Sequence, residues 1–309
     1  MPSPSLSHRD GRGTELSGIA LALLAVAFFS TSAVFVRLAA PISPYEITFW
    51  RMLFASGTVG LAAAASGAGP LPRERRYVLF GLVAAMHFLL FVTALSLTTI
   101  AHALSITYLA PVFTAVASWR LFGERLTPRQ MVGAVLAMAG IGVLVGFEPR
   151  LSGWMLLGDG LALLSALCYA VYSVIGRWER SRYGLLPYAL AVYGLATVWL
   201  APALIAGLAT RPAAAGSYTL PRVLALAGAG VLPLGFGHTL YNASLRRIPA
   251  TYANLLASQE VTGGVILGAL LLAEVPSPSA MVGAALAIGG IVLVLLRGSL
   301  ELTDPGGIA

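Results

Sequence analysis

The sequence contains no lysine, a single cysteine and few charged residues. Because a Walker phosphate-binding loop needs a lysine, this absence excludes ATP as the direct energy source of the chain. The lone Cys168 excludes a disulfide framework and a cysteine metal site. Charged residues make up 10% of the 309 residues and hydrophobic residues 58%, whereas soluble domains carry about 25% charged residues. This composition excludes a disordered chain, a nucleic-acid module and an ordinary cytosolic enzyme, and it favours a protein that crosses a membrane repeatedly.

Uncharged apolar runs predict ten transmembrane helices, because a helix needs about 20 apolar residues to cross the hydrocarbon core. The run over 77–119 is too long for one crossing, and the polar stretch Ser96–Thr99 predicts the turn where it folds back. Glu260 alone interrupts the run over 248–273. The expected helices cover residues 16–37, 45–66, 77–97, 101–121, 128–147, 153–177, 186–209, 222–245, 249–273 and 278–297.

The arginines predict the orientation of these helices. All 19 basic residues are arginines, and they stand in short clusters between apolar runs. With the N-terminus in the cytoplasm, fourteen of them fall in cytoplasmic segments, four fall outside, and Arg51 lies within the second helix. The positive-inside rule favours this orientation, with both termini cytoplasmic and the anionic bilayer surface, not nucleic acid, facing the positive charge. The first apolar run lacks a small-residue cleavage signal, which favours a retained helix.

The two ends of an internal repeat are visible in the sequence. Residues 18–37 and 158–177 share seven identities when aligned 140 residues apart. Residues 124–142 and 274–292 share ten identities when aligned 150 residues apart. Matches in the same order at both ends of two halves argue against chance among alanine, glycine and leucine.

Each half of the repeat would hold five helices. Because five is an odd number, the second half enters the membrane from the opposite side, and inverted repeats are typical of alternating-access transporters with a substrate site between the halves. We therefore expect an all-α membrane protein of ten transmembrane helices in two inverted five-helix repeats. Its expected parts are a cytoplasmic tail over 1–15, a first repeat over 16–147, a linker over 148–152, a second repeat over 153–297 and a cytoplasmic tail over 298–309.

Short motifs accompany this repeat. The fourth helix carries Leu109-Ala110-Pro111-Val112, followed by Gly123-Glu124, and the second half carries Glu260-Val261, followed by Ala273-Glu274 and a glycine-rich last helix. With these features, residues 16–297 resemble the drug/metabolite transporter superfamily in its ten-helix EamA-type branch. The resemblance implies a bacterial inner-membrane carrier, and the chain is similar to exporters of neutral and aromatic amino acids. The second half has no counterpart of Pro111, which leaves open whether the ninth helix bends like the fourth.

Glu260 is the acid expected at the greatest membrane depth, because it is the thirteenth residue of a 26-residue apolar run. A charge at this depth costs about 2.5–3.5 kcal/mol on insertion scales, so the side chain should face the bundle interior or a wet cavity. With its neighbour Gln259, it would bind a substrate ammonium group or couple protons. The alternative is a hydrogen-bonded link between helices.

Two histidines lie in mid-membrane positions. His87 is at the centre of the third helix, and His238, Tyr241 and Asn242 share one face of the eighth. No carboxylate or cysteine completes a zinc ligand set with them, so we expect no metal and no cofactor. These side chains would line a cavity or form ordinary hydrogen bonds between helices.

Tyrosines and one proline complete the candidate site. Tyr169 and Tyr172 share a face of the sixth helix, and Tyr108 precedes Pro111. Pro111 removes a backbone hydrogen bond and should bend the fourth helix near the midplane. The tyrosine rings would pack an apolar or aromatic substrate and their hydroxyls would orient it, unless they only fill helix interfaces. Glu46 and Arg51 on the second helix would pair with each other or with other groups, and both are interpreted as structural or gating residues.

The function expected from the sequence is secondary transport, not enzymatic catalysis. The chain would act as a monomer that exports small amphipathic metabolites, chiefly neutral or aromatic amino acids, through a central cavity. A multidrug or cationic-compound exporter is the alternative within transporters. A membrane-embedded binding or sensory protein that moves no solute is the alternative from another class.

Overall fold

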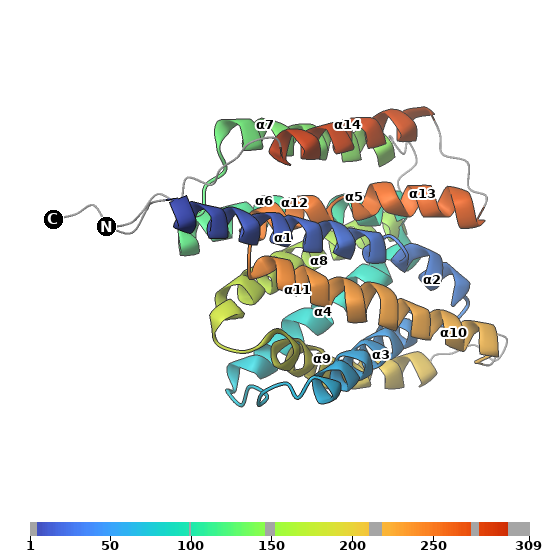
Figure 1. The fold of residues 1–309 in the computed structure, drawn as a ribbon. Helices are drawn as coiled ribbons and strands as arrows, with labels where there is room; N and C mark the ends of the chain where they lie inside the picture. The colour runs from blue at the N-terminus through green and yellow to red at the C-terminus, as the bar shows by residue number, and fades with distance from the viewer. Residues whose placement is uncertain (1–4, 99, 146–151, 210–217, 273–277, 296–309) are drawn as a thin grey trace.

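A computed structural model describes residues 5–98, 100–145, 152–209, 218–272 and 278–295 (Figure 1). These residues form helices and short connections, and no strand occurs among them. Seven helices or joined helix pairs are long and apolar enough to cross a membrane, and α7 and α14 contain shorter apolar stretches. The first half comprises α1 (Ser5–Phe29), α2 (Ser32–Leu38), α3 (Pro44–Ala65), α4 (Arg76–Leu97), α5 (Ile100–Thr107), α6 (Ala110–Phe122) and α7 (Pro128–Val145).

The second half comprises α8 (Gly153–Trp178), the 3-10 turn η1 (Glu179–Ser181), α9 (Leu185–Ala209), α10 (Leu220–Ala229), the π-helical segment η2 (Gly230–His238), α11 (Thr239–Leu245), α12 (Ala250–Ala257), α13 (Glu260–Leu272) and α14 (Pro278–Leu295). Four of the predicted spans are each divided into two or three consecutive helical segments. These are α1 with α2, α5 with α6, α10 with η2 and α11, and α12 with α13. The all-α, ten-helix prediction is therefore confirmed. The tail 298–309, most of the linker 148–152 and Glu274 lie outside the described residues.

Three details of the helices differ from the sequence-based expectation. Helix α1 begins at Ser5, within the segment expected as a tail. The first span is broken after Phe29, where the Ser30 and Thr31 hydroxyls donate to the carbonyls of Val26 and Phe28 at 2.8 and 2.7 Å. Such bonds from serine and threonine to the preceding turn bend helices. The eighth span widens into η2 around Pro233, which cannot donate a helical hydrogen bond.

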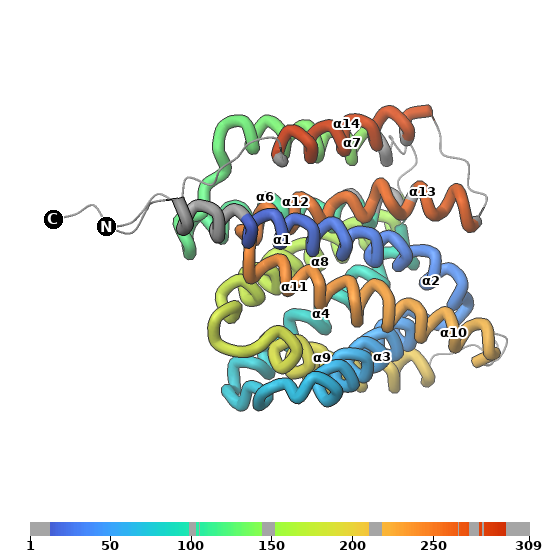
Figure 2. The backbone as a smooth tube through the Cα atoms, in the orientation of Figure 1, coloured from blue at the N-terminus to red at the C-terminus, as the bar shows by residue number. Residues whose placement is uncertain are grey.

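The helices pack in layers that reflect the inverted repeat. Helices α7 and α14, the last of each half, pair along one side of the molecule, and α3 and α9, the second of each half, pair along the opposite side (Figure 1). Between these pairs, the third helix of each half packs against the first helix of the other, α4 on α8 and α11 on α1. Figure 2 shows the same layering along the backbone trace.

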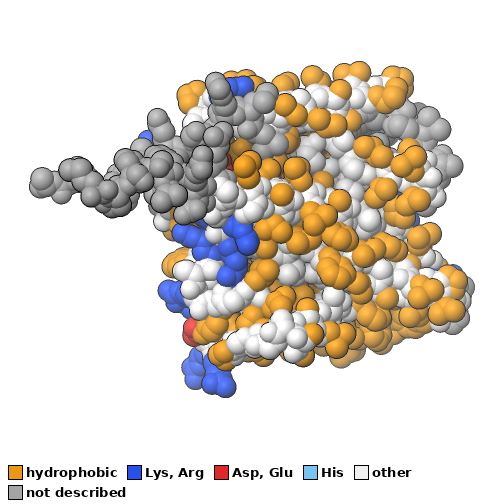
Figure 3. All heavy atoms as spheres, in the orientation of Figure 1, with side chains coloured by type: hydrophobic (Ala, Val, Ile, Leu, Met, Phe, Trp, Pro, Cys, Tyr) orange, Lys and Arg blue, Asp and Glu red, His pale blue; other side chains and the backbone are white. Residues whose placement is uncertain are grey.

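The surface of the molecule matches a bilayer. Large apolar side chains are strongly exposed around the helices, among them Leu61, Leu270 and Trp154. Figure 3 shows apolar side chains as a broad band across the molecule, with arginines gathered at one end. An apolar surface of this extent is stable when lipid covers it.

Candidate functional site

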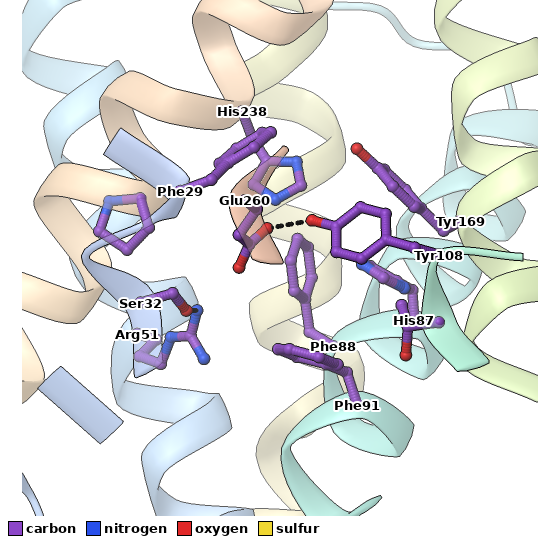
Figure 4. Close-up of a pocket in the computed structure, with 12 residues that line it drawn as sticks. Phe29, Ser32, Arg51, His87, Phe88, Phe91, Tyr108, Tyr169, His238 and Glu260 are labelled. Carbon is purple, nitrogen blue, oxygen red and sulfur yellow. Dashed lines mark hydrogen bonds between the residues drawn. The ribbon is translucent and has the colours of Figure 1, made fainter. Parts of the chain in front are cut away.

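The molecule contains a cavity whose wall is formed by side chains from both halves. Helices from both halves contribute side chains, and two of these side chains carry opposite formal charges, Arg51 and Glu260 (Figure 4). The remaining lining side chains are polar, aromatic or apolar. The lining residues are Phe29, Ser32, Arg51, His87, Phe88, Phe91, Thr107, Tyr108, Tyr169, Pro233, His238 and Glu260.

Two equivalent helix breaks adjoin this cavity. Helix α5 ends at Thr107 and α6 begins at Ala110, and the second half repeats both boundaries 150 residues later, at Ala257 and Glu260. Each break contains the same tight turn, in which a backbone N–H donates three residues back, from Leu109 to Ile106 and from Gln259 to Leu256, both at 3.0 Å. Pro111 stands directly after the first break. The ninth span thus breaks where the fourth does, without a proline.

The two breaks place Tyr108 and Glu260 in contact. The Tyr108 hydroxyl donates a hydrogen bond to Oε2 of Glu260. Tyr108 is buried, whereas Glu260 at the start of α13 is half-buried and faces the cavity. The bond connects the first half of the chain to the second at the cavity wall.

Arg51 reaches the cavity from the middle of α3. Its Nη2 donates to Ser32 Oγ at 2.9 Å, and Nε and Nη1 have no hydrogen-bond partner among the described residues, although the side chain is only 3% exposed. Arg51 forms no ion pair with Glu46, the partner considered from the sequence. Glu46 is bonded instead by Tyr218 at 2.6 Å and Ser43 at 2.8 Å.

Aromatic rings form much of the remaining wall. The His87 and Tyr169 rings stack at 4.8 Å, and His87 Nδ1 lies 3.1 Å from the carbonyl oxygen of Ser165, so one edge of the imidazole connects α4 to α8. His238 is the last residue of η2, and its ring centroid lies 4.5 Å from that of Phe29 and 4.9 Å from that of Phe88. Among the described residues, no three His, Cys, Asp or Glu side chains are grouped to hold a metal ion.

The structure separates the predicted site residues into two groups. Glu260, Tyr108, His87, Tyr169 and His238 line the cavity.

The second group lies behind the cavity wall. Asn242 Nδ2 donates to Tyr172 at 2.6 Å, Tyr241 donates to Ser173 at 2.7 Å, and Gln259 accepts from Thr262 at 3.3 Å. In this arrangement Tyr172, Tyr241 and Asn242 act as hydrogen-bonded links between helices.

Sequence reasoning gave Arg51 a structural or gating role and did not place it in the cavity, and it left out Ser32 and the three phenylalanines. For Arg51 a signal was present, because an ionisable residue within an apolar span marks a functional site by default. The phenylalanines carry no such signal, since aromatic residues occur throughout helix interfaces.

At the arginine-rich end of the molecule, polar bonds join the two halves. Arg177 forms an ion pair with Glu124 at 2.8 Å, and Tyr77 donates to the buried Glu179 at 2.8 Å. Tyr183 donates to Glu74 at 2.8 Å. The pKa of Glu74 is lowered, first by a hydrogen bond from its own backbone N–H and then by the Tyr183 hydroxyl.

The family assignment follows from comparison with known proteins. The EamA-like transporter family matches residues 16–146 and 156–296, one match in each half. The chain belongs to this family. The EamA-like assignment confirms the predicted superfamily and the duplicated, inverted architecture, and it makes the chain a multi-pass membrane transporter for small molecules.

Individual relatives agree with the family. A probable terminal-alkyne amino-acid exporter of Streptantibioticus cattleyicolor is 28% identical over 78% of this chain and 82% of its own length. The aromatic amino acid exporter YddG of Ancylobacter novellus is 26% identical over 91% of this chain and 97% of its own. A solved crystal structure at 22% identity has a TM-score of 0.79 and covers 91% of this chain and 97% of its own, which supports the EamA-like fold alone.

Proposed function

We propose that this transporter exports neutral or aromatic amino acids across the bacterial inner membrane, as a monomer with both termini in the cytoplasm. The observation that carries the proposal is a cavity between two inverted halves in which one cation and one anion face aromatic rings. Small-molecule sites combine apolar walls with a few convergent polar groups in this way. The names of two relatives, both amino-acid exporters, support the same substrate class.

The proposed mechanism is alternating access around the cavity. The repeats, proposed as 16–147 and 153–297, rock against each other, and the breaks beside Tyr108 and Glu260 allow parts of the fourth and ninth spans to move separately. Bonds between the halves at the arginine-rich end, such as Arg177 with Glu124, break when that end opens. Transporters with inverted repeats exchange equivalent conformations of their halves in this manner.

A cationic-compound exporter is the rival within transporters, and Glu260 alone would favour it. The buried Arg51 guanidinium in the same cavity repels a cation, because like charges in a poorly solvated site interact strongly. The pair of opposite charges therefore favours a substrate that carries both signs.

Flux into proteoliposomes tests the proposal. The purified full-length protein is reconstituted, and uptake of labelled phenylalanine, leucine and a cationic dye is measured with and without a pH gradient, against protein-free vesicles. We expect amino-acid uptake above the background and no dye uptake. Dye movement without amino-acid movement favours the multidrug alternative. Amino-acid binding without movement favours the sensory alternative.

A further inference from the structure

The Arg51 guanidinium is incompletely satisfied where it faces the cavity. Ser32 binds one of its three nitrogens at 2.9 Å, and the other two are buried without a partner in the described part of the chain. A buried cation without partners is costly, and the cost is offset when a ligand supplies an anion. The planar fork of arginine matches the two oxygens of a carboxylate. The cavity side of Arg51 is therefore suited to a carboxylate group.

Glu260 faces the same space from the other half of the chain (Figure 4). Tyr108 binds one carboxylate oxygen, and the second oxygen takes no hydrogen bond from the described residues. Arg51 and Glu260 form no ion pair with each other, so the two charges are not neutralised by direct contact. A ligand that carries both charges a few bonds apart would satisfy both side chains at once.

We propose that Arg51 and Glu260 recognise the backbone of an α-amino acid, with Arg51 binding the carboxylate and Glu260 the ammonium group. This assignment rests on the proposed function and names the residues that distinguish an amino acid from an amine or an acid. Ser32 orients the guanidinium, and Tyr108 holds the Glu260 carboxylate toward the cavity. Both positioning residues belong to the first half, whereas the two charges come from different halves.

The phenylalanine and imidazole rings of the wall receive the substrate side chain. Phe29 and Phe88 line the cavity next to His238, and Phe91 lines it beside His87. These rings present apolar faces without a fixed hydrogen-bonding pattern. Such a wall accepts apolar and aromatic side chains of different shapes. The backbone groups of the substrate would therefore be recognised strictly and its side chain loosely.

Three probes that differ by one charged group test the assignment. L-phenylalanine carries both charges, phenethylamine lacks the carboxylate and 3-phenylpropionate lacks the ammonium group. Their affinities are measured with the purified full-length protein and with two variants, Arg51→Gln and Glu260→Gln. We expect the protein to bind phenylalanine at least about tenfold more tightly than either analogue, since each lost charge-assisted hydrogen bond weakens binding by about 10- to 100-fold.

The two variants should show a crossed pattern. Arg51→Gln should weaken phenylalanine binding about 10- to 100-fold and leave phenethylamine binding unchanged or tighter, because the guanidinium that repels its ammonium group is gone. Glu260→Gln should weaken phenylalanine binding similarly and leave 3-phenylpropionate binding unchanged or tighter, because the carboxylate that repels it is gone. If Arg51→Gln does not fold, Arg51→Lys keeps the charge without the fork, and it should retain the preference for phenylalanine over phenethylamine at reduced affinity.

Arg129→Gln is the matched control, because Arg129 is an exposed arginine on α7, and its affinities for all three probes should be unchanged. Equal weakening of phenylalanine and phenethylamine in Arg51→Gln, or loss of the charge preference in Arg51→Lys, overturns the assignment. The proposed function is tested separately by flux. Amino-acid transport without the crossed pattern rejects only the roles of Arg51 and Glu260, whereas absence of amino-acid transport rejects the function itself.

Discussion

The Tyr108 hydroxyl donates a hydrogen bond to Glu260 across the boundary between the two halves of the chain. Tyr108 lies in the break of the fourth span, and Glu260 begins the helix after the equivalent break of the ninth. The backbone breaks are equivalent in the two halves, but the side chains are not. The position of the first half that corresponds to Glu260 is Ala110, which carries no acid. The two halves therefore contribute different side chains, a tyrosine and a glutamate, to the same cavity.

Tyr108→Phe removes the hydroxyl and keeps the ring. A hydrogen bond to a charged acceptor contributes about 1.5–3 kcal/mol, so we expect amino-acid transport to fall by about tenfold or more while the protein still folds. Tyr252→Phe is the matched control, because its hydroxyl bonds the Val294 carbonyl at 3.0 Å away from the cavity lining. Transport by Tyr252→Phe should stay near native. Equal transport by both variants would show that the Tyr108 bond has no part in the mechanism.

The orientation is tested by cysteine labelling in intact cells. Cys168 is replaced by alanine, and single cysteines are placed at the exposed positions Ser181 and Thr219. The positive-inside rule predicts that Thr219→Cys reacts with an impermeant maleimide from outside and that Ser181→Cys reacts only after the membrane is opened. The reverse pattern contradicts the orientation, and with it the export direction.

The positions of the helices could be predicted from the sequence, whereas the directions of their side chains could not. The bilayer thickness fixes the length of an apolar span, so hydropathy alone located the ten helices. The break after Phe29 depends on which carbonyls the Ser30 and Thr31 hydroxyls bond, and many serines in membrane helices form no such break. The ninth span breaks without a proline, and no local signal marks it.

The sequence could predict the membrane depth of the candidate site residues but not which of them line the cavity. Depth in an apolar run identified Glu260, because an ionisable residue within an apolar span marks a functional site by default. His238 and Asn242 share a helix face in the sequence, yet only His238 lines the cavity, while Asn242 bonds Tyr172. Which side chains meet depends on the rotation of each helix in the bundle, and single-helix periodicity does not contain that information.

Glu124 and Arg177 should control access from the arginine-rich end. Their 2.8 Å ion pair joins the two halves and is partly buried. Glu124→Gln removes the pair, and a loss of about 1 kcal/mol shifts a two-state equilibrium about fivefold. In a Cys168→Ala background with Thr107→Cys in the cavity lining, labelling from this side should become about two- to fivefold faster.

The control for this experiment is Arg120→Gln, because Arg120 contacts Trp119 on its own helix and, among the described residues, forms no ion pair with the other half. Its labelling rate should equal that of the background protein. A Glu124→Gln rate that matches the Arg120→Gln rate would show that the ion pair does not hold this end closed.

The close pairing of α7 with α14 depends on Gly140. A Cβ atom at this position would lie 2.8 Å from the Ala287 Cα and the Gly283 carbonyl oxygen, which leaves no room for a side chain. Gly140→Val should therefore destabilise the protein by about 1–3 kcal/mol and lower its melting temperature in detergent. Gly142→Val is the control on the same helix, where no atom lies within 4 Å, and it should melt like the native protein. Equal melting of the two variants would exclude close packing at Gly140.

Glu260→Gln tests whether the charge of the central carboxylate takes part in transport. Glutamine keeps the shape of the side chain and can still accept the Tyr108 hydrogen bond, so expression and folding should stay intact. The substrate ammonium group loses its anionic partner, and we expect uptake to fall by about tenfold or more at neutral pH. If Glu260 also exchanges protons during the cycle, the dependence of transport on pH should flatten in the variant, because glutamine does not titrate. Uptake is measured in proteoliposomes over a range of pH values, with Glu301→Gln as the control, since Glu301 lies in the tail expected after the last span. Native uptake and a native pH profile in Glu260→Gln would show that the residue is a neutral link between helices, and the search for the coupling group would then move to His87 and His238.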